Sequence, residues 1–363
     1  MKRIAIIAGI VLLLAVVGII IISGQKPKSA GQDKPTKVGM LMIGSRAESS
    51  WNEAHWQGIQ EAARELNLDI DCEENVEAPD CAEVIDQMVR RGCKIIISTS
   101  IDYENSVLQA AQAYPKIYFF QATGTKNRPN LANYMGRMYQ MRYLAGIAAG
   151  CQSQSGQIGY VTTEAIPEVV RGIDAFTLGV RKANPQARVY VKYTGSWTDE
   201  DKARSCTEEL LDKVPGIDVL GTHLDTDGVL EIAMQHHILA IGCNTDQSGL
   251  YPDIYLTAPI WKWDIFYTKY IREALNNKFE GRDYLVGAET GIVGLVPLHL
   301  QKDDGTAHIL RMERERIANG TFDVFYGPIY DNQGILRAAE GENLSDRMLF
   351  QELDWYVEGV VLP

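Results

Sequence analysis

The feature that most constrains the fold is an alternation of short apolar runs with helical stretches, which occurs twice along the chain. In the first half, segments typical of strands lie at residues 38–43, 68–71, 94–97 and 117–120. The pattern restarts after Gly150, with such segments at residues 157–161, 188–193, 219–221 and 239–242. Strands that alternate with helices through short loops form parallel sheets with right-handed crossovers. The sequence therefore predicts an α/β fold with two βαβαβ lobes.

The length of 363 residues fits two domains of about 150 residues each. We expect lobe 1 to span residues 37–150 and lobe 2 to span residues 151–254. The pattern is less regular from Ile254 onward, which favours segments that cross between the lobes. Part of residues 255–300 is expected to complete lobe 1, and part of residues 300–363 is expected to complete lobe 2.

The N-terminus carries an uncharged apolar stretch, residues 4–22, behind Lys2 and Arg3. A basic start followed by an apolar run indicates a secretion signal or a membrane anchor. The run is close to the roughly 20 residues of a spanning helix, and no clear cleavage site and no cysteine for lipid attachment follows it. We expect residues 1–24 to be a signal sequence or signal anchor and residues 25–36 a flexible linker. The body would then lie outside the cytoplasm, periplasmic or on the outer face of the membrane, with the apolar helix as a tether if uncleaved.

Composition and motifs exclude several classes of function. The formal net charge of −12 argues against nucleic acid or an anionic membrane surface as a partner. The six cysteines form no CxxC or Cys/His cluster, so we expect no metal. Cys72 and Cys81 flank a short acidic loop and could pair after export. Nucleophile, phosphate-loop and zinc-protease motifs are missing, which favours a binding protein without a cofactor over an enzyme.

Candidate ligand contacts follow the strands, because open α/β sheets bind ligands beyond the carboxyl ends of their strands. Trp51 and Trp197 fall at equivalent positions of the two halves, so we expect two aromatic faces to close on one flat ligand. Asp225 and Asp246 follow strands of the second half and could accept hydrogen bonds from ligand N–H groups. Each candidate also has a structural alternative: a tryptophan could pack in the core, and an aspartate before a helix commonly caps it.

Two histidines could line the same cleft. His55 lies one helical turn after Trp51. His223 ends a strand and could contact the ligand or satisfy a backbone group instead. Neither has a nucleophile beside it in the sequence, so a catalytic role for either is disfavoured.

Five motifs occur in order along most of the body: Ser50-Trp51-Asn52 with Trp56 and Gly58, Arg137 with Tyr143-Leu144-Ala145-Gly146, Gly195-Ser196-Trp197-Thr198-Asp199, Asn244-Thr245-Asp246-Gln247, and Leu256-Thr257 with Asp264. Together they resemble the basic membrane protein family of substrate-binding proteins for ABC transporters. The resemblance implies a type I periplasmic binding protein fold, in which two Rossmann-like lobes joined by a multi-strand hinge trap the ligand between them. Members of this family bind purine nucleosides or related compounds.

The resemblance also implies roles for individual residues. In nucleoside-binding relatives, aromatic residues at the positions of Trp51 and Trp197 stack on the base, and the acid that matches Asp246 contacts the ribose. The relatives' ribose-binding lysine falls at Trp261 here, and their aspartate after the fourth strand falls at Gln121. A tryptophan cannot replace the lysine's donation to ribose hydroxyls, and its extra volume shrinks the cleft. The resemblance therefore favours a free purine base over a nucleoside.

A branch of the family with these tryptophans and with a histidine at the position of His55 looks adapted to a free base such as adenine. The predicted ligand-binding residues are Trp51, Asn52, His55, Gln121, Asn133, Tyr139, Trp197, His223, Asp225, Asp246 and Trp261. We expect a monomeric, exported protein that delivers a purine to an ABC permease in the membrane. The alternatives are a purine nucleoside-binding protein, a ligand-sensing receptor subunit and a nucleoside-processing enzyme.

Overall fold

The computed structural model describes residues 34–47, 50–299 and 305–363. The compact body comprises Lys37–Pro363. The predicted signal or anchor, residues 1–24, and most of the predicted linker lie outside the described residues. Among those that are described, no helix is both long and apolar enough to cross a membrane.

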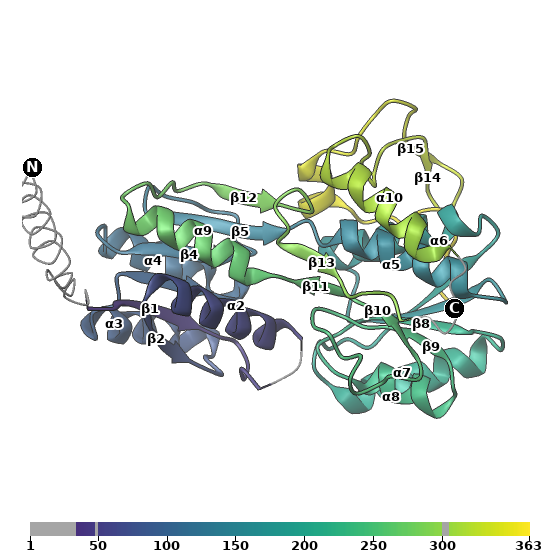
Figure 1. Ribbon diagram of the computed structural model, residues 1–363, viewed down its shortest axis with the longest axis horizontal. Coiled ribbons are helices and arrows are strands. Elements are labelled where there is room, and N and C mark those ends of the chain that lie inside the picture. The colour runs from purple at the N-terminus through teal and green to yellow at the C-terminus, as the bar shows by residue number, and fades with distance from the viewer. Residues whose placement is uncertain (1–33, 48–49, 300–304) are drawn as a thin grey trace, which may run out of the picture. The chain divides into compact units, whose positions relative to one another are not determined.

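Lobe 1 is built on a six-stranded sheet in the order β12-β5-β4-β3-β1-β2 (Figure 1). Neighbouring strands from β12 to β1 pair in parallel. The strands are β1 (Thr36–Leu41), β2 (Leu68–Glu73), β3 (Ile95–Ser98), β4 (Tyr118–Ala122), β5 (Leu131–Gly136) and β12 (Asp283–Val286). The helices that cover the sheet are α2 (Trp51–Leu66), α3 (Cys81–Arg90), α4 (Glu104–Ala113) and α9 (Trp263–Leu275).

Both faces of the first sheet are buried, because successive side chains of a strand point to opposite faces. Ile95 and Ile97 of β3 join the core cluster that contains α2 and α9. Ile96, between them, joins a second cluster with α3 and α4. A strand buried on both faces reads as a continuous apolar run, which is why the run at residues 94–97 predicted β3.

Lobe 2 repeats the plan with the strand order β10-β9-β8-β6-β7-β16, and all neighbouring pairs are parallel. Its strands are β6 (Gln157–Thr162), β7 (Arg188–Tyr193), β8 (Val219–His223), β9 (Leu239–Ile241), β10 (Tyr255–Thr257) and β16 (Val360–Val361). Its covering helices are α5 (Tyr139–Gln152), α6 (Pro167–Ala183), α7 (Glu200–Lys213) and α8 (Gly228–Gln235). Two parallel α/β sheets confirm the predicted fold class.

Several segments connect or extend the lobes. The antiparallel pair β11 (Pro259–Trp261) and β13 (Val293–Leu295) runs between the two sheets (Figure 1). The C-terminal part contains α10 (Thr306–Ala318), β14 (Ile329–Tyr330), β15 (Leu336–Ala338) and a short helical turn at Met348–Glu352. Two further short helical turns, Ala78–Asp80 and Ile101–Tyr103, lie in lobe 1. The lobe boundaries that we expected at residues 150 and 254 stay predictions, with residue 150 falling inside α5.

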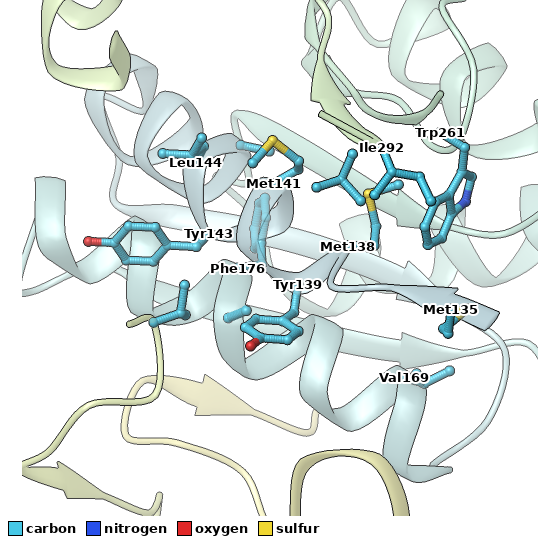
Figure 2. Packing of buried hydrophobic residues seen from close by; sticks show 14 of the residues in the cluster. Met135, Met138, Tyr139, Met141, Tyr143, Leu144, Val169, Phe176, Trp261 and Ile292 are labelled. Atoms are coloured by element: carbon cyan, nitrogen blue, oxygen red, sulfur yellow. The ribbon is translucent and has the colours of Figure 1, made fainter. Parts of the chain in front are cut away.

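One core cluster continues through both lobes. Figure 2 shows Met138, which precedes α5, beside Ile292 and Trp261 from the segments that run between the sheets. Tyr143 of α5 and Phe176 of α6 extend the same cluster into lobe 2. This continuity gives the walls of the space between the lobes a rigid apolar support.

The helices α5 and α6 approach closely at two glycines. A Cβ atom on Gly146 would lie 2.0 Å from the carbonyl oxygen of Phe176, and one on Gly179 would lie 1.9 Å from that of Tyr143. We expect Gly179→Ala to lower the free energy of unfolding by about 1–3 kcal/mol, because the helices must move apart. Urea denaturation measures this loss. Gly249→Ala, where a Cβ meets nothing within 4 Å, is the control and should change stability by less than about 0.5 kcal/mol.

Candidate ligand-binding site

A cavity of about 750 Å³ lies between the two lobes. Thr99 and Ser100, which follow β3 of lobe 1, line it together with Trp197, which follows β7 of lobe 2, and Asp225, which follows β8. The cavity therefore sits at the carboxyl ends of the parallel strands, where open α/β sheets bind ligands. Its volume falls in the upper half of the range of about 300–1,000 Å³ that is typical of small-molecule sites.

Most of the predicted site residues line this cavity. Those that do are Trp51, Asn52, Tyr139, Trp197, His223, Asp225 and Trp261. The other four do not line it in the structure: His55, Gln121, Asn133 and Asp246.

His55 is fully buried behind Trp51, away from the cavity. Its ring meets the Trp51 indole edge-on at 4.4 Å and stacks on Trp263 at 4.5 Å. Its Nδ1 lies 2.5 Å from the hydroxyl oxygen of Tyr267. Burial lowers the pKa of His55 well below its usual value, so the ring is neutral. The position of His55 suits it to support Trp51 rather than to contact a ligand.

Gln121 and Asn133 make hydrogen bonds within lobe 1. The Gln121 amide donates to the carbonyl oxygen of Ser100 at 2.6 Å and accepts from the Ser98 hydroxyl at 2.5 Å. Gln121 thereby fixes the loop whose residue Ser100 lines the cavity. The Asn133 amide donates to Asp283 at 2.7 Å, which ties β5 to β12.

Asp246 is exposed, and its carboxylate accepts the backbone N–H of Ser248 at 3.0 Å. Asn244, two residues earlier in the same motif, lines the cavity instead. Asn244 adopts a left-handed backbone conformation with φ of 63°. The ribose contact that the resemblance implies for Asp246 stays a prediction.

A hydrogen-bonded network joins the lobes at the cavity wall, and we call Ser50, Asp225, Asn244 and Trp261 the inter-lobe network. The Ser50 hydroxyl of lobe 1 donates to the Asp225 carboxylate of lobe 2 at 2.5 Å. The Asn244 amide donates to Asp225 at 3.1 Å and to the Ser50 hydroxyl at 2.8 Å. The Trp261 indole N–H donates to the side-chain oxygen Oδ1 of Asn244 at 3.0 Å.

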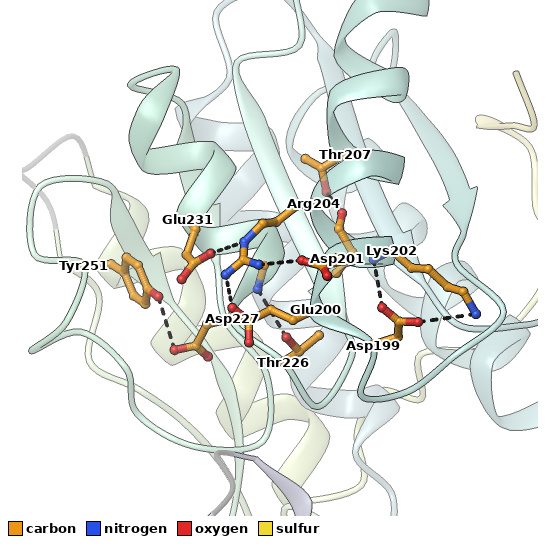
Figure 3. Close-up of polar contacts among 12 residues, drawn as sticks. Asp199, Glu200, Asp201, Lys202, Arg204, Thr207, Thr226, Asp227, Glu231 and Tyr251 are labelled. Atoms are coloured by element: carbon orange, nitrogen blue, oxygen red, sulfur yellow. Dashed lines mark hydrogen bonds and ion pairs between the residues drawn. The ribbon is translucent and has the colours of Figure 1, made fainter.

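The Asp225 carboxyl group has an unusually high pKa for an aspartate. Burial raises its pKa to about 6, although hydrogen bonds from Ser50, Asn244 and the Trp51 backbone favour the ionised form. Asp227, two residues later, accepts hydrogen bonds from Tyr251 at 3.2 Å (Figure 3) and from Gln247 at 2.5 Å. These bonds tie the loop that carries Asp225 to the loop that carries Asn244.

Two indoles stand on the cavity wall, one from each lobe. The Trp51 N–H donates to the carbonyl oxygen of Thr99 at 2.9 Å, and its ring meets Trp261 edge-on at 5.7 Å. The Trp197 ring meets His223 edge-on at 5.5 Å, and its carbonyl accepts the Asp225 N–H at 2.8 Å. Within the described chain, the two indoles make no ring contact with each other.

Two arginines that were not predicted from the sequence also line the cavity, Arg142 on α5 and Arg171 on α6. They escaped notice because they lie on helices, not on the loops after strands. A signal was available for Arg142, which is the only charged residue of the apolar stretch 138–151. A charge in such a stretch indicates a buried group that needs polar partners.

The sequence predicts no metal site and leaves a Cys72–Cys81 disulfide open. In residues 34–47, 50–299 and 305–363, no group of His, Cys, Asp and Glu side chains could hold a metal ion. All six cysteines are free thiols, including Cys72 and Cys81, whose pairing the sequence left open.

A polar and aromatic cavity between two parallel α/β lobes defines a two-lobed solute-binding protein. Residues 35–322 match the family model of Bmp, the PnrA-like ABC transporter substrate-binding proteins, and the chain belongs to this family. The match confirms the resemblance inferred from the motifs. It also confirms that the protein binds its substrate without catalysis, as the solute-binding component of an ABC transporter, and acts outside the cytoplasm.

Individual relatives agree with this assignment. A purine-binding protein of Brucella abortus is 30% identical over 335 residues, which cover 92% of this chain and 95% of the relative. A putative ABC transporter glucose-binding protein of Haloferax volcanii is 32% identical over 321 residues, covering 88% and 79% of the two chains. A solved solute-binding protein of an ABC transporter system from Conexibacter woesei superposes with a TM-score of 0.69 at 21% identity, covering 79% and 98%.

Proposed function

We propose that the protein binds a free purine base between Trp51 and Trp197 and delivers it to an ABC permease. The observation that carries this proposal is the pair of indoles that line one cavity from opposite lobes. A planar base can stack on both when the lobes close, and stacking on an aromatic side chain contributes about 1–3 kcal/mol per base. The purine-binding relative from Brucella abortus supports the same ligand class.

Polar groups beside the indoles can complete the recognition of a base. Asp225 accepts hydrogen bonds only, when ionised, so it can receive a ring or amino N–H of the ligand. A closed cavity excludes water, so each N–H of the base needs such a partner. Closure would occur by bending of the segments that run between the sheets, among them β11 and β13.

The preference for a base over a nucleoside rests on Trp261. Its one polar atom, Nε1, already donates to Asn244, and its ring stacks on Trp263 at 4.5 Å. Trp261 therefore has no donor left for ribose hydroxyls, unlike the lysine that relatives carry at this position. Cavity size does not add to this preference, because 750 Å³ exceeds the space of a bicyclic base. The purine nucleoside-binding alternative thus remains the nearest rival within the family.

A monosaccharide is a second candidate. The cavity is also lined by Asp102, Glu168 and Arg142, and carboxylates and guanidiniums can each pair with neighbouring hydroxyl groups. The relative from Haloferax volcanii is named as a putative glucose-binding protein. A test of the ligand class therefore has to compare purines with glucose.

A thermal-shift screen of purine bases, purine nucleosides and glucose tests the proposal. A ligand that binds only the folded state raises the melting temperature by mass action, so at 100 times Kd we expect a rise of several degrees with a purine base. Trp197→Ala should shrink this rise. A rise with glucose and none with any purine would overturn the proposal, and a larger rise with nucleosides would move it to the nucleoside alternative.

A further inference from the structure

Arg142 is a buried cation that faces the cavity with most of its donors unused. Its side chain is 4% exposed and lines the cavity wall. It donates to the Tyr160 hydroxyl at 3.1 Å and to the Cys243 sulfur at 3.5 Å. A guanidinium carries five N–H donors and no acceptor, so three donors of Arg142 have no hydrogen-bond acceptor among the described residues.

Arg171 lies on the same side of the cavity, on α6. It is 5% exposed, donates to the carbonyl oxygen of Leu349 at 2.6 Å, and its guanidinium lies 4.0 Å over the Phe350 ring. In the described part of the chain, no carboxylate comes within 4.0 Å of Arg171 or of Arg142 to form an ion pair. Glu168 also lines the cavity and its charge acts on both, but at longer range.

His223 stands beside the two arginines, and we call Arg142, Arg171 and His223 the arginine corner. A Cβ atom on Gly172 would lie 3.1 Å from both Arg142 Cδ and His223 Nδ1, so a glycine at this position lets the two side chains approach. His223 Nδ1 is buried without a partner in the described chain. Burial and the two guanidiniums lower the pKa of His223 well below its usual value, so the ring is neutral.

Buried cations without carboxylate partners are costly unless a ligand supplies acceptors. Purines differ at the edge that the position-6 substituent forms with N7. A 6-oxopurine presents two adjacent acceptors, O6 and N7, which match the bidentate fork of arginine, whereas adenine presents an amino donor beside N7. A guanidinium cannot accept from that amino group, which would be left unpaired in the closed cavity.

We propose that the arginine corner binds the O6/N7 edge of a 6-oxopurine, and that the protein therefore selects hypoxanthine-type or guanine-type bases over adenine. This inference rests on the proposed function, purine binding, and narrows it. It departs from the preference for adenine that the family resemblance implied, because that preference did not take Arg142 and Arg171 into account.

Isothermal titration with hypoxanthine and adenine tests the inference, since the two bases differ only at position 6 and the adjacent N1. We expect the wild-type protein to bind hypoxanthine about tenfold or more tightly than adenine. Arg142→Met and Arg171→Met should weaken hypoxanthine binding to the level of adenine and leave adenine binding nearly unchanged. Arg181→Met, on α6 but outside the cavity and paired with Glu358, is the matched control and should keep the wild-type ratio.

The outcomes separate the two proposals. Equal or tighter wild-type binding of adenine, or an equal loss of both bases in the methionine variants, overturns the arginine corner and leaves purine binding intact. If neither base binds while glucose does, purine binding itself is overturned. Adenine binding reports that each variant is folded, and Arg142→Lys and Arg171→Lys, which keep the charge without the fork, should give intermediate ratios.

Discussion

Trp51→Ala is expected to lower the free energy of unfolding by about 3 kcal/mol and also to weaken ligand binding, whereas Trp197→Ala is expected to weaken binding with a smaller loss of stability. The reason for the first loss lies in the neighbours of Trp51. Its indole meets His55 and Trp263 edge-on at 4.4 and 5.8 Å and donates to Thr99. Truncating a large core aromatic costs about 3–5 kcal/mol, and the half-buried Trp51 belongs at the lower end.

Trp197 has a different environment. It is half-buried, and its one ring contact in the described chain is the edge-on contact with His223. Trp197→Ala should therefore lower the free energy of unfolding by less than Trp51→Ala does, because the Trp197 indole packs only partly against the core. On the proposed binding mode it removes one stacking face, so Kd should rise about tenfold or more.

Urea denaturation without ligand and titration with a purine base separate the two effects. Trp56, which lies on α2 like Trp51 but outside the cavity beneath the Arg46 guanidinium, offers the matched control. Trp56→Ala should lower stability without changing Kd. Unchanged ligand affinity in Trp197→Ala would mean that this indole does not stack on the ligand.

The sequence predicted the sheets well where strands are buried on both faces, and less well elsewhere. The runs that became β1, β3 and β6 are continuous apolar stretches with short flanking loops. The strand β5, Leu131–Gly136, was not recognised, because Asn133 interrupts its apolar pattern and Gly136 ends it. Its burial comes from its place between β4 and β12, which is a tertiary fact that a local pattern does not contain.

Part of the site could also be predicted from the sequence. The rule that ligands bind beyond strand ends led to Trp51, Trp197 and Asp225, all of which line the cavity. The rule is silent on helices, so Arg142 and Arg171 were missed. The strand-end rule also cannot resolve which side chain within one loop faces the cavity. It pointed to Asp246, whereas Asn244 of the same loop lines the cavity.

Asp225→Asn is expected to make the protein more stable at pH 7, by up to about 3 kcal/mol, and to leave its stability at pH 4 nearly unchanged. Burial raises the pKa of Asp225 from its usual 3.8 to about 6 in the folded protein. At pH values between the unfolded pKa of 3.8 and the folded pKa of about 6, the folded state binds a proton that the unfolded state does not. The wild-type carboxyl group therefore adds stability at low pH, and this contribution is lost as the pH rises through about 6. Asparagine resembles the protonated form at every pH, so it avoids that loss.

Ligand binding should respond to the same substitution in the opposite direction. On the proposed binding mode, the ionised Asp225 accepts an N–H of the ligand, and hydrogen bonds to charged groups contribute more than neutral ones. Asp225→Asn should therefore raise Kd, by about tenfold. The wild-type Kd should likewise rise as the pH falls below about 6, because protonation removes the charged acceptor. The ionised Asp225 would then lower the stability of the protein near neutral pH while it strengthens ligand binding.

Urea unfolding of wild type and Asp225→Asn between pH 4 and pH 8 measures the difference in their free energies of unfolding. The contributions of other titrating groups, such as the buried Asp174 and His223, largely cancel in this difference.

Asp199→Asn provides a control in which the stability should change with pH in the opposite direction. The Asp199 carboxylate caps α7 by accepting the Lys202 N–H, and this bond lowers the pKa of Asp199. Its contribution is present near neutral pH and is lost on acidification, so Asp199→Asn should destabilise at pH 7 and not at low pH. If the difference between wild type and Asp225→Asn stays constant from pH 4 to pH 8, the carboxyl group titrates as it would in water, and the inter-lobe network does not enclose it in solution.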